Sequence, residues 1–440
     1  MALGKSRRVR FARFGVCASG AKPEKQNGLW AVESENCEVG ESLKRGVGVR
    51  LLYREDGSSY GINNTVQKGD YYFSLRTDGE EKIGFVTENG LLFLDNGTKP
   101  LSRHDFGLRT GGTVVYDTND QEKMAFANEN GVWIYDENSG AVKTALTSAS
   151  RVLCFFKERL FCVQKPVTLA YSAPVAPSDF ESSIDGGGKI ALPSTRGEIV
   201  ALVPMQEKLY VFHEYGICVL QGAGSGKEFS IREIPYHGAR IFGDSVGACF
   251  EKAYFLTETG LYVLADDVAS PACENLAIKP KTDGQVCAHA QSNGKYYLRY
   301  LDETGVATGL VVDNRSGNGY KCFAMTGLSS CKGESVCFSN GGFCRVENGG
   351  ELPVGVKAYF TAKNLDFSSA GVKTLKSLRV FGVGNARVQA CAGGRTRTVA
   401  LVLTTGSTEA YIGVRGKEFS LKIELDKGAE ITAIEAEVVE

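Results

Sequence analysis

Short apolar runs recur along this chain about every forty positions, each followed by a turn and a second run. In four copies a basic residue opens the first run, and a glycine eight positions later opens the second. The runs are rich in Val, Ile, Phe, Tyr and Leu and show no helical period. The pattern predicts β-hairpins, with glycine supplying the positive φ that such turns need. The four pairs are Lys82 and Gly90, Lys123 and Gly131, Lys208 and Gly216, and Lys252 and Gly260.

Three weaker copies of the hairpin pattern begin at Arg159, Lys295 and Ser335, where the second glycine is replaced or displaced. An isolated hairpin is marginally stable in water, so repeats of this size are stable only when stacked against neighbours. Four short strands with their turns occupy about 40 to 50 residues, which is one propeller blade. We therefore expect an all-β fold containing a β-propeller of about seven blades, with six and eight as the alternatives.

The repeat does not account for the whole chain. A length of 440 residues exceeds what one core usually fills, so a second domain is expected. Asn348, Gly349, Gly350 and Pro353 interrupt the pattern, and the short strands after them lack it. Such a segment suits a small antiparallel β-sandwich or jelly roll. The expected domains are an N-terminal basic arm and lead-in segment over residues 1–44, the β-propeller over 45–350 and a C-terminal β-sandwich over 351–440.

Charge and hydropathy narrow the function classes. The formal net charge of −1 excludes a generally basic nucleic-acid binder. No apolar run reaches the roughly 18 residues of a membrane span, so no membrane insertion is expected. The thirteen cysteines include no Cys-x-x-Cys pair, and many occupy strand positions suited to a small hydrophobe. We expect buried free thiols in a chain that folds in a reducing cytoplasm.

Candidate chemistry is scarce in this sequence. The four histidines, His104, His213, His237 and His289, belong to no catalytic or metal-binding motif. The spacing of Cys331, Cys337 and Cys344 fits no zinc pattern. No catalytic residue, metal or cofactor is therefore expected.

Two short segments resemble parts of glycan-processing sites. Residues 183–190 contain the Ser-x-Asp-x-Gly turn of the aspartate boxes in sialidase-like propellers, but the turn occurs once and ends in Ile190. We interpret it as a glycine-rich turn without chemistry. Asp266 and Asp267 are adjacent acids, which do not by themselves give the separation that glycoside hydrolysis needs, so we expect a solvated turn.

The N-terminus is the one region with a strong charge bias. Residues 1–13 hold five basic residues and no acid. The segment is either a solvated arm or an arm that binds an acidic surface of a neighbouring subunit or nucleic acid. The candidate contact residues are Lys5, Arg7, Arg8, Arg10 and Arg13.

Segments at the centre and at both ends of the chain carry a family resemblance. Residues 171–174 (Tyr-Ser-Ala-Pro) and 177–180 (Pro-Ser-Asp-Phe) lead from an expected blade strand into a Pro-x-Asp-Phe turn. In this the chain resembles phage tail hub and nozzle proteins, the packaged-DNA stabilisation family of the head-to-tail joint. Residues 40–48 are similar to the approach to that family's first blade, and 415–420 to the closing strands of its C-terminal domain. Further similar segments are 197–202, 209–212, 216–220, 243–246 and 254–262.

The resemblance implies a structural virion protein of the tail, assembled in the host cytoplasm. Copies would form a homo-oligomeric ring that extends or closes the DNA channel. The implied partners are portal or connector proteins and tail fibre or needle proteins, with passive contact to translocating DNA. Two alternatives remain open: a receptor- or glycan-binding tail propeller that stacks sugars on aromatic residues at blade turns, and a propeller glycosidase with inward carboxylates at a defined separation.

Overall fold

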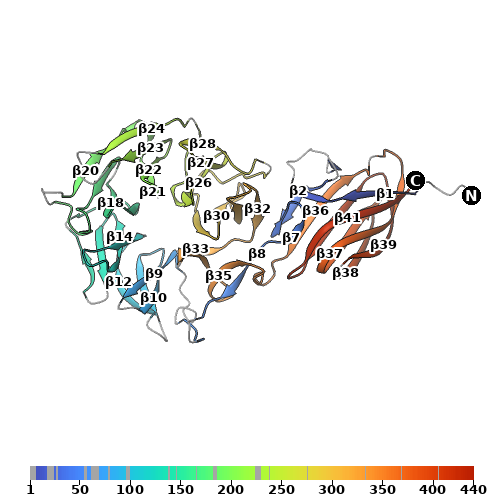
Figure 1. The fold of residues 1–440 in the computed structure, drawn as a ribbon, viewed down its shortest axis with the longest axis horizontal. Helices are drawn as coiled ribbons and strands as arrows, with labels where there is room; N and C mark the ends of the chain where they lie inside the picture. The colour runs from blue at the N-terminus through green and yellow to red at the C-terminus, as the bar shows by residue number, and fades with distance from the viewer. Residues whose placement is uncertain are drawn as a thin grey trace, which may run out of the picture.

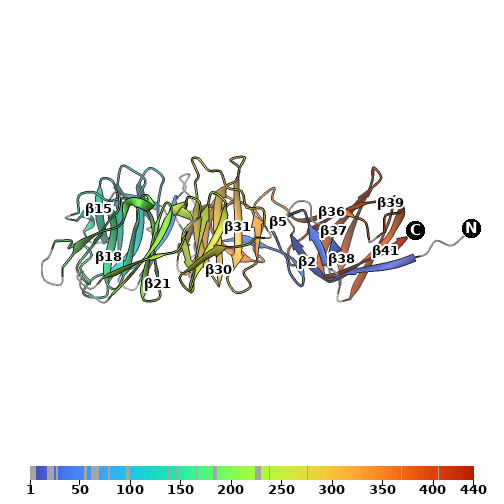
Figure 2. The same ribbon diagram turned by 90° about the horizontal axis from the view of Figure 1, so that it is seen from above.

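The protein consists of a β-propeller and a β-sandwich that lie side by side along its long axis (Figures 1 and 2). The start of β1 at Ser6 and the end of β41 at Val439 pair with each other in the sandwich, remote from the propeller. The computed structural model describes residues 6–16, 24–25, 28–53, 57–60, 69–77, 80–95, 100–136, 139–144, 146–164, 166–181, 186–222, 229–236, 238–274, 276–331, 333–367, 369–404 and 406–440.

Seven four-stranded antiparallel sheets form the blades of the propeller. Neighbouring blades cover both faces of a blade's central strands, which explains why these strands are continuously apolar. The first four blades are β9 (Tyr71–Thr77), β10 (Glu80–Val86), β11 (Leu91–Asp95) and β12 (Pro100–Asp105); β13 (Gly111–Tyr116), β14 (Glu122–Asn128), β15 (Gly131–Asp136) and β16 (Gly140–Lys143); β17 (Leu153–Phe156), β18 (Arg159–Gln164), β19 (Thr168–Tyr171) and β20 (Gly188–Ala191); and β21 (Ile199–Met205), β22 (Lys208–His213), β23 (Gly216–Gln221) and β24 (Ser230–Ile234).

The last three blades follow the same pattern, except that the outer strand of the seventh comes from the N-terminal part of the chain. They are β25 (Gly247–Cys249), β26 (Lys252–Thr257), β27 (Gly260–Ala265) and β28 (Val268–Pro271); β29 (Ala288–Ser292), β30 (Lys295–Leu301), β31 (Ala307–Asp313) and β32 (Gly319–Cys322); and β33 (Thr326–Cys331), β34 (Glu334–Ser339), β35 (Gly342–Asn348) and β8 (Val47–Leu51).

The seven blades confirm the expected propeller, and every repeat read from the sequence begins in or at the second strand of a blade. The pattern did not show one feature of the chain's course. β8, which precedes the first blade in the chain, pairs with β35 of the seventh blade, with Val49 opposite Val346. β8 thereby supplies the strand that the seventh blade would otherwise lack.

The ring of blades closes between the seventh and the first. The backbone N–H of Tyr72 on β9 donates to Ser329 Oγ on β33 at 2.9 Å. The Tyr72 ring lies 4.8 Å from that of Phe343, between centroids. A buried cluster that includes Phe85 and Val336 fills the space between these two blades.

Aromatic side chains fill the spaces between blades. Phe85, Phe126, Phe212 and Phe255 are all buried, at 1%, 0%, 0% and 0% exposure. Phe212 and Phe255, from the fourth and fifth blades, meet edge to face with ring centroids 5.4 Å apart. Such ring pairs add to the free energy gained by burying apolar area.

The C-terminal module is a β-sandwich with one large core. Its longest strand, β37, pairs first with β39 and β41 and then, beyond Gly384, with β38 and β40. A single strand thus belongs to both sheets and bends between them. The C-terminal strands are β36 (Ala358–Leu365), β37 (Lys373–Ala392), β38 (Arg395–Leu403), β39 (Ser407–Gly416), β40 (Phe419–Leu425) and β41 (Glu430–Val439).

The N-terminal segment is part of this sandwich, which corrects the expected division at residue 44. β1 pairs with β41, β5 with β36 and β7 with β41, and Phe11, Phe14 and Leu43 are buried in the sandwich core. The N-terminal apolar side chains cover core surface that the C-terminal strands alone leave open. The remaining strands are β1 (Ser6–Phe11), β2 (Arg13–Val16), β3 (Glu24–Lys25), β4 (Gly28–Ala31), β5 (Glu33–Glu35), β6 (Cys37–Glu38) and β7 (Leu43–Arg45).

Helical structure in the described residues is restricted to short 3-10 turns, of which η2 (Ser194–Arg196) and η3 (Gly243–Ser245) are examples. Within that part of the chain, no helix has the length and apolar character needed to cross a membrane.

Candidate functional site

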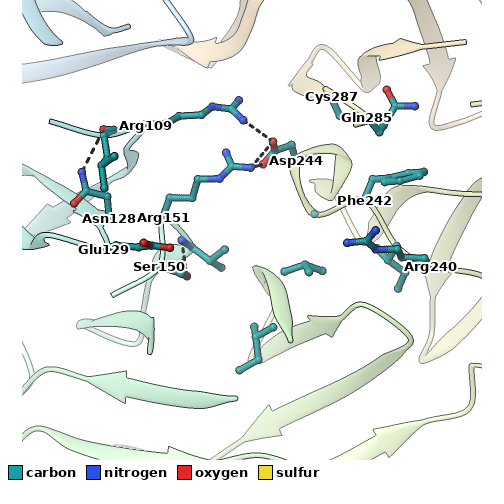
Figure 3. A pocket seen from close by; sticks show the side chains of 16 residues that line it. Arg109, Asn128, Glu129, Ser150, Arg151, Arg240, Phe242, Asp244, Gln285 and Cys287 are labelled. Atoms are coloured by element: carbon teal, nitrogen blue, oxygen red, sulfur yellow. Dashed lines mark hydrogen bonds and ion pairs between the residues drawn. The ribbon is translucent and has the colours of Figure 1, made fainter. Parts of the chain in front are cut away.

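The first strands of the blades converge on the propeller axis, where they surround a cavity of about 460 Å³. Charged side chains contribute to the lining, among them Arg109, Glu129, Arg151, Arg240 and Asp244 (Figure 3). These residues lie at the strand starts or turns of several blades, so they meet only when the ring of blades is closed.

An ion-pair network crosses this cavity and joins four blades. Arg109 Nε donates to Asp70 Oδ2 at 2.6 Å, and Arg109 Nη2 to Asp70 Oδ1 at 2.8 Å. Arg109 Nη1 also donates to Asp244 Oδ2 at 3.2 Å, and Arg151 donates to the same carboxylate (Figure 3). Asp70 precedes the first blade, Arg109 the second, Arg151 the third and Asp244 the fifth. We call these four residues the axial network.

The position of Asp244 is fixed by the η3 turn. Ser245 Oγ donates to the carbonyl of Phe242 at 2.5 Å and accepts from the N–H of Leu256 at 2.8 Å. The buried Tyr296 hydroxyl donates to the Ser245 carbonyl, and His289 Nδ1 lies 2.9 Å from the carbonyl of Asp244. The Asp244 backbone is therefore anchored to the fifth and sixth blades while its side chain reaches toward the second and third.

Charge in the axial network is balanced, with two guanidinium groups and two carboxylates. Burial alone would lower the pKa of Arg109, but the hydrogen bonds and charges of Asp70 and Asp244 raise it above its usual value. Nearby, Arg240 pairs with Glu214 at 2.8 Å. The network therefore consists of fixed, paired charges, an arrangement that can hold blades in register or hydrogen-bond a polar ligand.

Of the described histidines, His289 lies beside the axial network, in a space that Asp70, Arg109, Arg151 and Asp244 also line. Burial lowers the pKa of His213 and of His289, and each ring places Nδ1 against a backbone carbonyl. Burial also lowers the pKa of His104, whose ring packs against Phe106. His237 lies outside the described residues.

The cysteines occupy packing positions. The described thiols are free, and all are buried except Cys391, which is partly exposed. Cys287 lines the axial cavity, but burial raises its pKa and so disfavours the thiolate. Cys337 lies opposite Cys344 on paired strands. Over the described ranges, no group of three His, Cys, Asp or Glu side chains is arranged to hold a metal ion.

The acidic turn at Asp266 and Asp267 is not simply solvated, which corrects the expectation for the second residue. Asp267 accepts hydrogen bonds from Lys208 Nζ at 2.8 Å, Tyr210 Oη at 2.7 Å and Arg232 Nη2 at 2.5 Å. It therefore ties the fifth blade to the fourth. The Ser-x-Asp portion of the glycine-rich turn at 183–190 lies outside the described residues.

The basic N-terminal residues do not form a free arm over the described part of the segment. Arg7, Arg8 and Arg10 lie on β1 and Arg13 on β2, whereas Lys5 lies outside the described residues. Arg10 Nη1 forms an ion pair with Glu435 Oε1 at 3.1 Å. The pairing of β1 with β41 brings Glu435 close to Arg10, although the two residues are 425 positions apart in the sequence.

Sequence reasoning missed the axial network entirely. Asp70, Arg109, Arg151 and Asp244 belong to no local motif, although their separations of 39, 42 and 93 residues are close to one, one and two periods of the blade repeat. A usable signal is their common position, since each lies just before the first strand of its blade.

Comparison with known proteins gives structural matches alone. No protein-family model and no curated protein matches the chain. The extracellular domain of a two-component-system protein from B. thetaiotaomicron matches with a TM-score of 0.43 and 11% identity, over 80% of this chain and 47% of that one. BamB from Moraxella catarrhalis matches with a TM-score of 0.39 and 11% identity, over 68% of this chain and 99% of that one. The chain thus spans about half the length of the first of these structures, and at such similarity neither match carries information about function.

Proposed function

We propose that this protein is a structural, non-enzymatic subunit of a phage tail, of the hub or nozzle type. Copies form a ring that extends or closes the DNA channel and docks other tail proteins. The observation that carries the proposal is the axial network. In the cavity at the centre of the propeller, Asp70 and Asp244 are already paired with Arg109 and Arg151. We therefore infer that partners bind to the outer surface of the protein and not in this cavity.

The axial network also restricts where DNA would pass. Asp244 and Arg109 cross the propeller axis, joined at 3.2 Å. A channel bridged in this way is too narrow for a duplex. DNA would therefore run along the axis of the ring of subunits, while each propeller acts as a rigid block in the wall of that ring.

The connection between the two modules suits a load-bearing subunit. Lys295 Nζ on β30 of the propeller pairs with Glu38 Oε2 on β6 of the sandwich at 3.2 Å. Lys427 pairs with Glu351 at 2.5 Å, and Glu351 also forms backbone hydrogen bonds with Val49. Several independent contacts of this kind oppose hinge motion between propeller and sandwich.

The resemblance to tail hub and nozzle proteins supplies the rest of the proposal. Residues 171–180, which carry its central motif, form the end of β19 and the tight turn after it, where the Ala173 N–H donates to the Asp179 carbonyl at 2.7 Å. The proposed neighbours are portal or connector proteins on one side of the ring and fibre or needle proteins on the other. The proposed location is the virion tail, after assembly in the host cytoplasm.

The two alternative functions receive less support from the surface. Phe250 and Tyr215 are exposed at blade turns, at 72% and 47%, as a sugar-stacking surface would need. However, Phe250 follows the first strand of its blade and Tyr215 the second, so antiparallel order places them on opposite faces of the propeller. For a glycosidase, the inward carboxylates would include Glu129 besides Asp70 and Asp244, and the latter two are bound by arginine.

The proposal is tested on particles. Virions would be purified from producing cells and examined by mass spectrometry for this chain and by cryo-electron microscopy for its fold. We expect the chain in stoichiometric amounts, with density for propeller and sandwich repeated around the tail axis. Purified particles that lack the chain would overturn the proposal. Cleavage of a polysaccharide panel by the purified protein, or specific binding on a glycan array, would favour the alternatives.

A further inference from the structure

The sandwich sheet that contains β1 has two open edges. Its strands lie in the order β39, β37, β41, β1, and in the described part of the chain β1 pairs only with β41 and β39 only with β37. Figure 1 shows β1 and β39 on opposite sides of the module. Open edges carry unpaired backbone N–H and C=O groups, which readily pair with a strand from another chain.

Charges alternate across this sheet in one cross-strand row. Arg10 on β1 lies opposite Glu435 on β41, Glu435 lies opposite Arg379 on β37, and Arg379 lies opposite Glu409 on β39. The ion pairs at the two ends measure 3.1 Å for Arg10 with Glu435 and 3.4 Å for Arg379 with Glu409. The row thus begins with a cation at one edge and ends with an anion at the other, and the side chain of Glu409 remains 47% exposed.

A second row, next to the first, also begins with a cation on β1 but ends with an aromatic residue on β39. Arg8 on β1 lies opposite Glu437, Glu437 opposite Ser377, and Ser377 opposite Tyr411 on β39. Glu437 accepts from Lys376 at 2.9 Å and from Ser377 at 3.2 Å. Tyr411, at the far edge, is 66% exposed. A guanidinium group and an exposed aromatic ring therefore mark the two ends of this row.

Strand direction allows the two edges to meet. β37 runs antiparallel to both β39 and β41, and β1 runs antiparallel to β41. β1 and β39 are consequently antiparallel to each other. A second copy displaced along the sheet brings its β39 beside β1 as an antiparallel neighbour, with Arg10 opposite Glu409 and Arg8 opposite Tyr411.

We propose that copies of this chain associate head to tail through these strands, with β1 of one copy pairing with β39 of the next. The inference rests on the proposed function, because it names the contact that would build the ring. Each junction adds backbone hydrogen bonds, continues the alternating charge row and places Arg8 over the ring of Tyr411. A head-to-tail contact closes into a ring when the rotation per subunit allows it.

Pairing between identical edges is disfavoured by the same charges. Two β1 strands in contact would bring Arg7, Arg8 and Arg10 of one copy against those of the other, and like charges on facing strands repel. Nε and Nη2 of Arg7 are shielded from solvent and have no hydrogen-bond partner within the described residues. A strand that carries acidic or aromatic side chains, such as β39, therefore fits the β1 edge better than a second β1 strand does.

Disulfide cross-linking tests the contact directly. The full chain carrying Arg10→Cys and Glu409→Cys would be oxidised both as purified protein at rising concentration and in virions. We expect a ladder of dimers, trimers and longer species on non-reducing gels. Arg10→Cys alone, Glu409→Cys alone and the wild-type chain are the controls, and each should stay monomeric.

The outcomes separate this contact from the proposed function. If the chain is found in particles but the double-cysteine variant forms no ladder there or in solution, the edge contact is wrong while the tail role stands. If the ladder forms in solution and the chain is absent from particles, the contact stands and the tail role fails. Dimers from Arg10→Cys alone would replace head-to-tail pairing with symmetric pairing and so overturn the proposal.

Charge reversal gives a second test with its own control. Arg10→Glu and Glu409→Arg should each reduce multimers by tenfold or more. The two combined in one chain should recover part of the multimers, because opposite charges again face each other at the junction, while each new side chain faces a like charge, Glu435 or Arg379, within its own chain. Arg387→Glu breaks an exposed ion pair with Glu424 on the other sheet and should leave multimers unchanged. Failure of the combined variant to recover, with both single variants folded, would count against the contact.

Discussion

The side chain of Asn36 accepts a hydrogen bond from the backbone N–H of Phe323 at 2.8 Å, across the junction of sandwich and propeller. Its Nδ2 donates to the carbonyl of Lys357 on the sandwich side, also at 2.8 Å. The Asn36 backbone adopts φ of 54° and donates to the carbonyl of Lys321 on β32. One buried asparagine thus satisfies backbone groups of both modules at their contact.

Replacing Asn36 should loosen this junction. We expect Asn36→Ala to reduce the free energy of unfolding by about 2 to 4 kcal/mol, because two backbone groups lose their partners and alanine is strained at positive φ. Asn36→Gly tolerates the backbone conformation and isolates the side-chain contribution. Urea unfolding followed by tryptophan fluorescence measures both. If both variants unfold at the wild-type midpoint, Asn36 does not hold the modules together.

The sequence predicted the parts of the fold that depend on local pattern. The copies that begin at Lys208 and Lys252 mark β22 and β26, because a strand buried on both faces must be apolar along its whole length. Turn glycines such as Gly260, which has a φ of 141°, lie at the start of the following strand, here β27. The expectation of about seven blades, with six and eight as alternatives, followed from these features.

The parts that were missed depend on pairing between distant segments. Val49 pairs with Val346 and Arg10 with Glu435, and nothing within either segment specifies its partner. The same applies to Arg109 and Asp244, which meet only because the ring of blades closes. The sequence pattern of an alternating or apolar strand predicts that the strand will be buried, but it does not predict which strand will pair with it.

Phe255 is expected to be among the largest single contributors to propeller stability. It is fully buried between the fourth and fifth blades against Phe212 and Tyr236. Phe255→Ala should cost about 3 to 5 kcal/mol, from lost burial and the cavity that remains. Phe250→Ala is a matched control, since Phe250 is 72% exposed five residues earlier, and should cost less than about 0.5 kcal/mol. Comparable thermal shifts for the two variants would contradict the interblade assignment.

Asp244 should stabilise the propeller through charge. Asp244→Asn keeps the size of the side chain but removes the anion that Arg109 and Arg151, from the neighbouring second and third blades, share. We expect a loss of about 1 to 3 kcal/mol, measured by chemical unfolding. Asp283→Asn, at an exposed position, is the control and should have little effect. An Asp244→Asn variant as stable as wild type would show that the network is not structural.

Acid sensitivity is expected at Asp267. Burial alone would raise its pKa, but hydrogen bonds from Lys208, Tyr210 and Arg232 outweigh burial and lower the pKa below its ordinary value of 3.8. The folded protein therefore favours the carboxylate more than the unfolded chain does. This stabilisation is complete above the unfolded pKa and is lost as pH falls through the folded pKa.

The stability difference between wild type and Asp267→Asn should therefore shrink as pH falls from about 6 to about 3. Unfolding midpoints across this range measure it. Asp266→Asn, at the exposed neighbouring position, should show no such trend. A difference that stays constant with pH would mean that the hydrogen bonds of Asp267 do not depend on its charge.

The basic strand β1 should matter for assembly and little for folding. In the variant with Arg7, Arg8 and Arg10 replaced by Ser, β1 keeps its backbone pairing with β41, and the exposed Arg10 pair with Glu435 contributes only about 0.2 to 1 kcal/mol. We expect a nearly unchanged melting temperature but reduced incorporation into particles. Salt should weaken incorporation of the wild-type chain more steeply than that of the variant, because the variant has fewer charges to screen.

The matched control for this variant replaces Arg387, Arg395 and Arg397 by Ser, which removes the same charge from exposed positions on β37 and β38. If both triple variants lose incorporation equally, assembly responds to net charge and not to the β1 edge. If the β1 variant incorporates as the wild-type chain does, these arginines make no contact that assembly requires. Only a selective loss in the β1 variant supports the placement of Arg8 and Arg10 against a neighbouring subunit.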